Sequence, residues 1–160
     1  TGAADALPEG TQVVHLTGRG KDEAVRAAVE AAGLSDRWYV IDYLTTMEDA
    51  LAVADLVVCR SGAGTVAEME ALGLPCIYVP LPIGNGEQRL NAADHVAAGG
   101  AQLIDDKDFT ADFVRRNVFP LLGSARLEDM AAASQSLGRA GAARALADLA
   151  LEQVKEAGHE

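Results

Sequence analysis

Residues 56–68 read Leu56-Val57-Val58-Cys59-Arg60-Ser61-Gly62-Ala63-Gly64-Thr65-Val66-Ala67-Glu68, a strand-like run joined to a helical run through small residues. Gly62, Ala63 and Gly64 allow a ligand to come close to the backbone. The first N–H groups of the helix that follows have no partner within that helix and point at whatever lies there. This stretch therefore predicts a strand, a turn and a helix start that together suit a nucleotide diphosphate.

The same stretch also fits a plainer interpretation, a helix cap. Thr65 and Glu68 stand before apolar Met69 and Leu72, with the spacing of a capping box, in which two side chains bond the backbone at a helix start. The local pattern alone does not decide between an anion site and a cap.

A second polar loop follows the next strand-like run, and its residues 84–92 read Gly-Asn-Gly-Glu-Gln-Arg-Leu-Asn-Ala. Loops that follow parallel strands emerge at the same edge of the sheet, where open α/β sheets bind ligands. Gln88 and Asn91 stand three residues apart, so on a helix their amides share a face and can bond the hydroxyls of a sugar. The two loops are therefore predicted to face one ligand.

Strand-like and helix-like segments alternate along the chain, which is typical of an α/β fold with a parallel sheet and right-handed crossovers. The predicted strands are residues 12–16, 38–43, 56–59, 76–79 and 102–104, and the predicted helices are residues 22–32, 46–54, 65–72, 88–98, 110–122, 127–137 and 142–157. The apolar run 56–59 does not alternate, which predicts burial of that strand on both faces. We see neither a domain boundary nor a repeat and expect one domain, 1–160.

The composition favours a soluble enzyme domain. The chain has 160 residues, of which 49% are hydrophobic and 23% charged, and it has no run of about 18 apolar residues that could span a bilayer. Thirteen basic against 24 acidic residues give a net charge of −11, which argues against a nucleic-acid partner and against docking to anionic lipid. Local N–H groups must then hold an anionic nucleotide.

The cysteines and histidines show no metal-ligand spacing. Cys59 and Cys76 lie in predicted neighbouring strands, and we expect free thiols in a reducing cytoplasm. His15, His95 and His159 lie far apart, and His15 is expected to be packed or hydrogen-bonded within its strand. No signal peptide or lipidation motif is visible, which favours the cytoplasm.

Together, the two motifs resemble the donor-binding half of the MurG family. The residues that carry the resemblance are Cys-Arg-Ser-Gly-Ala-x-Thr-x-x-Glu from Cys59, Gly-Leu-Pro from Gly73, a strand ending in Pro80, and Glu-Gln-x-x-Asn-Ala from Glu87. Residues 80–91 are similar to actinobacterial members. MurG enzymes are inverting GT-B glycosyltransferases of peptidoglycan synthesis, which move N-acetylglucosamine from UDP-GlcNAc to undecaprenyl-pyrophosphoryl-MurNAc-pentapeptide. The resemblance implies a Rossmann-like C-terminal domain of such an enzyme.

The resemblance also implies roles for individual residues. Glu68 would accept hydrogen bonds from the ribose hydroxyls of UDP, and Ala63, Gly64 and Thr65 would contact the diphosphate and the sugar. The backbone of Leu44 would pair with uracil, with Met47 close by, and Gln88 and Asn91 would read the hydroxyls of N-acetylglucosamine. Arg60 and Ser61 belong to the motif, and Arg60 would hold the loop or the phosphates.

Each role has a plainer alternative. Leu44 and Met47 also fit a place in the core, because apolar residues beside a strand end usually pack. Gln88 and Asn91 also fit a solvated helix start, and Arg60 a pairing with one of the acidic residues.

Some parts of a MurG enzyme are not found in this sequence. In that family the donor half begins earlier, with a strand and a glycine-rich phosphate loop, and an acceptor half precedes it. We expect a domain truncated on its N-terminal side, with an unpaired edge beside the absent strand. No catalytic base is assigned, so the chain alone is expected to bind donor at most. The lipid-linked acceptor would be bound through the absent half, and the full-length enzyme would be peripheral on the cytoplasmic face of the membrane.

No cofactor is expected, because no Asp-x-Asp motif is present where a GT-A type enzyme would need one, and the helix start after Gly64 can stabilise the leaving group instead. Two other functions stay open at this point. One is a split or non-catalytic subunit that binds a UDP-sugar. The other is a GT-B transferase for a different lipid or natural-product acceptor.

Overall fold

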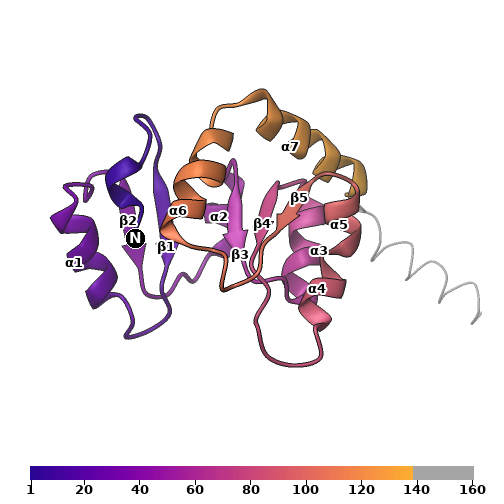
Figure 1. Ribbon diagram of the computed structural model, residues 1–160, viewed down its shortest axis with the longest axis horizontal. Helices are drawn as coiled ribbons and strands as arrows, with labels where there is room; N and C mark the ends of the chain where they lie inside the picture. Colours follow the sequence, from indigo (N-terminus) through magenta and orange to yellow (C-terminus); the bar gives the residue numbers. More distant parts are fainter. Residues whose placement is uncertain (139–160) are drawn as a thin grey trace, which may run out of the picture.

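The computed structural model describes residues 1–138, and the predicted helix at 142–157 lies outside them. Strands and helices alternate in these residues, and every strand pair is parallel (Figure 1), which confirms the α/β class. The strands are β1 (Val13–Leu16), β2 (Trp38–Ile41), β3 (Val57–Cys59), β4 (Cys76–Tyr78) and β5 (Ala101–Leu103). All five strands lie within the predicted ranges or one residue beyond them.

The strands form two separate sheets. β1 pairs with β2, and β4 lies between β3 and β5 in the second sheet. Among the described residues, β1 has no strand partner besides β2, and β3 has none besides β4. The unpaired edge that we expected from the sequence is therefore present. The described strands form two sheets where we predicted one.

Burial of β3 on both faces is a wrong prediction. Val57 and Cys59 are half-buried, but Val58 between them is 44% exposed. A continuous apolar run is typical of a parallel strand that helices cover on both sides. In the described part of the chain, the Val58 side of β3 is open to solvent instead.

The helices begin and end close to their predicted bounds. They are α1 (Glu23–Ala31), α2 (Met47–Ala52), α3 (Ala63–Leu72), α4 (Glu87–Asn91), α5 (Ala93–Ala97), α6 (Ala111–Phe113) and α7 (Ala125–Leu137). The predicted helix at 88–98 is interrupted at Ala92 and gives α4 and α5. The side chains of Thr110 and Ser124 accept backbone N–H bonds at the starts of α6 and α7, which caps these helices.

Three turns of other helix types complete the part of the chain that the structure describes. A 3₁₀ turn at Ala4–Ala6 was not predicted. The predicted helix at 110–122 continues after α6 as a wide π turn, Val114–Val118, and a 3₁₀ turn, Phe119–Leu121. Pro120 lies in the 3₁₀ turn, and because proline has no N–H and a fixed φ, a regular α-helix does not pass through it.

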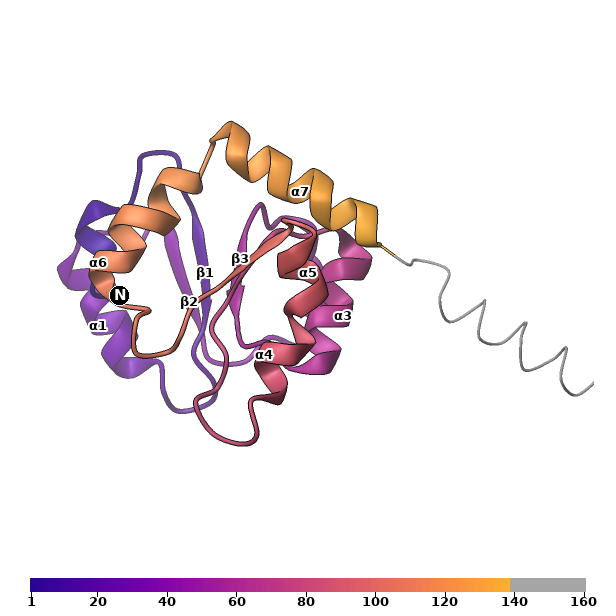
Figure 2. The ribbon, with the colours of Figure 1, turned by 45° about the vertical axis from the view of Figure 1, so that its right-hand side comes forward.

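The core lies on both faces of β4. Cys76, Ile77 and Tyr78 are fully buried, and alternate strand residues point to opposite faces. Cys76 and Tyr78 pack with Val66 and Met69 of α3, whereas Ile77 packs with residues of the segment 118–130. Figure 2 shows α3 and α5 on one side of the strands and α6 on the other. This packing fixes the end of β4, from which the second polar loop emerges.

Cys59 and Cys76 are free thiols on neighbouring strands, as predicted. His15 lies beside Trp38, with 6.2 Å between the ring centroids, so it is a packed histidine as expected. Within residues 1–138, we find no helix with both the length and the apolar character that a membrane span requires.

Candidate functional site

The glycine-rich loop leads directly into α3. This helix begins at Ala63, two residues earlier than predicted, and Gly62 is its N-cap. Thr65 therefore lies inside the first turn, and the capping-box interpretation is wrong, because no side chain of the described residues accepts a hydrogen bond at this cap. The first turn also has no acidic residue. Its leading N–H groups thus remain available to an anion, at the positive end of the helix dipole.

The surface above this helix start is open. Ala63 and Gly64 are exposed, Thr65 is half-buried, and Glu68 is exposed on the second turn of α3. A Cβ added at Gly64 meets no atom of residues 1–138 within 4 Å. A ligand therefore has room to lie against this backbone.

Ser61 differs from its neighbours, because its side chain is 0% exposed. Its Oγ finds no hydrogen-bond partner among the described residues. The backbone of Ser61 takes part in the site instead, since its carbonyl oxygen accepts a hydrogen bond from the second motif.

The structure brings the two motifs together through one hydrogen bond. Asn91 donates from Nδ2 to the carbonyl oxygen of Ser61 at 3.1 Å, and Gln88 accepts the backbone N–H of Leu81 through Oε1 at 2.9 Å. Both residues lie on α4 and are half-buried, and each side chain already holds one hydrogen bond to the chain, so neither is fully solvated. Each amide keeps one group for a ligand, an NH₂ donor on Gln88 and an oxygen acceptor on Asn91.

Arg60 spans the ends of three strands. Its guanidinium donates to the carbonyl oxygens of Val79 at 3.0 Å and Pro80 at 3.2 Å. It also forms an ion pair with Asp106 at 2.5 Å. The alternative that Arg60 pairs with an acidic residue is thus confirmed, and the guanidinium holds the loop ends in place.

Arg89 of the second motif forms an ion pair with Asp105. Two adjacent aspartates after β5 therefore neutralise the arginines of both motifs. Sequence reasoning missed Asp105 and Asp106. The available signal was a pair of acidic residues directly after a strand, at the edge where the other two loops emerge.

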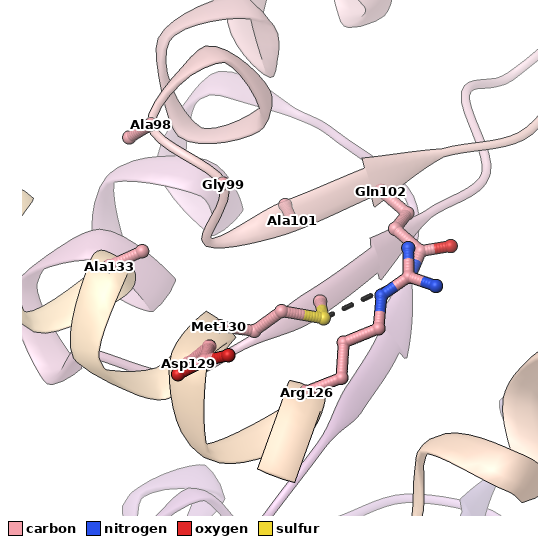
Figure 3. A pocket seen from close by; sticks show the side chains of 8 residues that line it. All are labelled: Ala98, Gly99, Ala101, Gln102, Arg126, Asp129, Met130 and Ala133. Carbon is pink, nitrogen blue, oxygen red and sulfur yellow. Dashed lines mark hydrogen bonds between the residues drawn. The ribbon is translucent and has the colours of Figure 1, made fainter. Parts of the chain in front are cut away.

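A cavity of about 460 Å³ lies at this edge, lined by residues 80–84, Gly86, Arg89 and residues 105–107. It is bounded by the second loop and the segment after β5. A second cavity, of about 350 Å³, lies at the opposite edge, where β5 begins (Figure 3). Gln102 and Met130 line that second cavity, with the Gln102 amide 3.9 Å from the sulfur of Met130. None of the predicted site residues lines either cavity.

Leu44 and Met47 come from the other sheet. They follow the carboxyl end of β2, which ends at Ile41, two residues earlier than predicted. Leu44 is half-buried, and Met47, the first residue of α2, is 39% exposed. Met47 is therefore not a core residue. Like the two motifs, Leu44 and Met47 lie beyond the carboxyl end of a strand. In the described residues we find no hydrogen bond between these two residues and either motif.

A buried polar cluster lies behind the second motif and was missed by the sequence reasoning. The side chains of Tyr78, His95 and Ser134 are all fully buried. The Tyr78 hydroxyl lies 2.9 Å from His95 Nδ1, and His95 Nε2 lies 2.8 Å from Ser134 Oγ. Burial lowers the pKa of His95 and raises the pKa of Tyr78, so the histidine is neutral at pH 7 and the tyrosine keeps its proton.

We expect the free energy of unfolding to decrease as the pH falls below 6.5, the ordinary pKa of histidine. The pKa of His95 is lowered in the folded chain, so the unfolded chain binds a proton that the folded chain does not, and stability is lost with falling pH. Burial lowers the pKa of His15 in the same direction. Asp5 and Asp22 have pKa values below their ordinary 3.8, so their protonation changes the free energy of unfolding only at more acidic pH.

Urea unfolding followed by circular dichroism between about pH 7 and pH 5 measures this loss. A His15→Gln variant removes the contribution of His15 and leaves that of His95. Constant or rising stability toward pH 5 in this variant contradicts a neutral, buried His95.

Residues 1–138 contain no group of three or more His, Cys, Asp or Glu side chains placed to hold a metal ion. The site as described therefore consists of a helix start, a carboxylate, two oriented amides and two paired arginines. These are groups that hydrogen-bond an anion and hydroxyls.

Comparison with known proteins gives consistent results. The sequence profile of the glycosyltransferase family 28 C-terminal domain matches residues 2–146. The UDP-N-acetylglucosamine--N-acetylmuramyl-(pentapeptide) pyrophosphoryl-undecaprenol N-acetylglucosamine transferase of Paenarthrobacter aurescens is 46% identical over 156 residues, which are 96% of this chain and 41% of that protein. The enzyme of the same name from Mycolicibacterium smegmatis is 54% identical over 121 residues, which are 75% of this chain and 31% of that protein.

Among solved structures, the crystal structure of Acinetobacter baumannii MurG matches with a TM-score of 0.82 and 27% identity. The match covers 92% of this chain and 43% of that one. This chain thus spans less than half the length of the relatives that it matches.

Proposed function

This chain belongs to the glycosyltransferase family 28 C-terminal domain family, and we propose that it binds UDP-N-acetylglucosamine as the donor-binding part of a glycosyltransferase. The observation that carries the proposal is the junction of the two motifs. The open start of α3 and the oriented amides of α4 are held together by the hydrogen bond from Asn91 to Ser61. An anion and a polyhydroxylated sugar, covalently joined, match these two neighbouring sets of groups.

The proposed roles follow the chemistry of each group. The diphosphate lies against the N–H groups of Ala63, Gly64 and Thr65, because a helix start favours an anion. Glu68 accepts the ribose hydroxyls as an exposed carboxylate. The free NH₂ of Gln88 and the free oxygen of Asn91 bond the hydroxyls of N-acetylglucosamine.

The remaining candidates take supporting roles. Arg60 braces the loop rather than binding a phosphate, because its guanidinium already contacts two carbonyl oxygens and Asp106. Ser61 contributes its carbonyl oxygen, which fixes Asn91. Leu44 and Met47, beyond β2, line the place of the uracil.

For the whole protein, we propose the activity in the name of the P. aurescens relative, transfer of N-acetylglucosamine to the undecaprenol-linked acceptor. The acceptor hydroxyl attacks the anomeric carbon, the bond to UDP breaks with inversion, and the start of α3 stabilises the charge on the leaving diphosphate. No residue of this chain is assigned as the base that takes the proton. The acceptor is held by the part of the protein outside this chain, at the cytoplasmic face of the membrane.

Isothermal titration of this chain with UDP-N-acetylglucosamine, UDP-glucose and UDP tests the proposal, after circular dichroism has shown that the chain is folded. We expect binding of all three, with UDP-N-acetylglucosamine bound about fivefold to thirtyfold more tightly than UDP, the effect of one or two hydrogen bonds of about 1 kcal/mol each. Equal affinity for UDP and UDP-N-acetylglucosamine contradicts the sugar roles of Gln88 and Asn91. Lack of binding by the folded chain contradicts the proposed site as a whole.

A further inference from the structure

The helix that carries Gln88 and Asn91 lacks an apolar anchor of its own. No residue of α4 is buried, although helices are usually fixed by an apolar face that packs on the core. The chain continues through Ala92, which is fully buried but small, into α5. His95 is the only buried residue of α5. A histidine is therefore the first large side chain after α4 that enters the core.

The hydrogen bonds around His95 run in one direction. Ser134 Oγ lies 3.0 Å from the carbonyl oxygen of Met130 and 3.2 Å from that of Gly100, so it donates its proton to a carbonyl group. It then accepts from His95, whose Nε2 carries the hydrogen. Nδ1 is thus the acceptor, and the Tyr78 hydroxyl donates to it. Each polar atom of this chain of bonds has a partner.

The imidazole ring has no room to move. A Cβ at Gly100 would lie 2.5 Å from Ser134 Oγ and 2.6 Å from His95 Nε2, so only glycine fits at position 100. On the other side, the ring of Tyr78 meets the histidine edge to face, with 5.6 Å between centroids. Strand β4 and helix α7 therefore hold the ring from two sides.

We propose that His95 is a positioning residue for the sugar end of the donor. Tyr78 and Ser134 fix its ring, the ring fixes the start of α5, and α5 sets α4 so that Asn91 reaches Ser61 and the Gln88 amide faces the ligand. This inference rests on the proposed function, because it assigns to the buried cluster an effect on the sugar and none on the nucleotide.

Two variants that each remove one oxygen test the inference. In Ser134→Ala and in Tyr78→Phe, the affinity for UDP-N-acetylglucosamine is expected to fall about fivefold, the effect of one hydrogen bond, while the affinity for UDP is unchanged. Hydrogen exchange of the amides of residues 87–97 is expected to accelerate about fivefold, while α3 exchanges as before. Ser134→Ala, on helix α7, keeps the test available if Tyr78→Phe does not fold.

Matched controls come from the same residue types outside the cluster. Ser136→Ala lies on α7 and is exposed, and Tyr39→Phe lies on β2 with its hydroxyl bonded to the Asp36 carbonyl. Neither control is expected to change binding or the exchange of residues 87–97.

The outcomes separate this inference from the proposed function. An equal loss of affinity for both ligands indicates a general loss of structure and overturns the positioning role. If the unaltered chain does not prefer UDP-N-acetylglucosamine to UDP, the proposed sugar site fails, and hydrogen exchange still decides whether the buried cluster fixes α4 and α5. Unchanged exchange of residues 87–97 in both variants overturns the positioning of these helices by His95.

Discussion

Replacement of Glu68 by alanine is expected to weaken the binding of UDP and of UDP-N-acetylglucosamine by about 10- to 140-fold, equal to about 1.5–3 kcal/mol for hydrogen bonds to a charged group. Glu68 is exposed on the second turn of α3, beyond the helix start proposed for the diphosphate. Both ligands contain the ribose, so the affinity for each is expected to fall by the same factor. Isothermal titration of the variant and of the unaltered chain with each ligand measures it.

Two further variants make the Glu68 result specific. Glu68→Gln keeps one oxygen acceptor without the charge and is expected to lose less affinity than Glu68→Ala. Glu30→Ala removes an exposed carboxylate of α1, outside both motifs, and should leave binding unchanged. An affinity for UDP that is the same in Glu68→Ala as in the unaltered chain is incompatible with the ribose role.

The local elements were predictable because their signals are local. Apolar runs of a few residues predict β1 to β5, and the predicted helices at 22–32 and 65–72 end just before Gly33 and Gly73, which both adopt positive φ. The meeting of the two loops was also predictable, since it follows from parallel strands alone. The Asn91–Ser61 hydrogen bond is the observed form of that prediction.

Features that depend on distant residues were not predictable from one sequence. Val58 is exposed because no element of the described residues covers its side of β3. An apolar run in the sequence does not reveal whether such a cover is present. The partner of Arg60, Asp106, lies 46 positions later in the chain and is one of 24 acidic residues. His95 was considered only as a possible metal ligand, yet its partner Ser134 comes from a helix 39 residues away.

The largest loss of stability is expected for Gly73→Ala, at the junction of α3 and α7. Gly73 ends α3 with φ +69°, and an added Cβ would lie 2.5 Å from Gln135 Cγ and 3.2 Å from Gln135 Cα. The left-handed backbone costs a residue with a Cβ about 1–2 kcal/mol, and overpacking against α7 costs about 1–3 kcal/mol more. Urea unfolding should therefore show a loss of about 2–5 kcal/mol, a large part of the stability of a small domain.

Gly33→Ala separates the two causes of this loss, because the chain offers a matched site. Gly33 follows α1 with φ +68°, and a Cβ there meets no atom of residues 1–138 within 4 Å. This variant bears only the backbone cost, so it should lose about 1–2 kcal/mol. Gln135→Ala in the Gly73→Ala background removes Gln135 Cγ, the atom nearest to the added Cβ, and should restore part of the lost stability. The effects of substitutions at residues in contact are not additive. Equal losses in Gly33→Ala and Gly73→Ala would mean that α7 yields to the added methyl group and does not fix the end of α3.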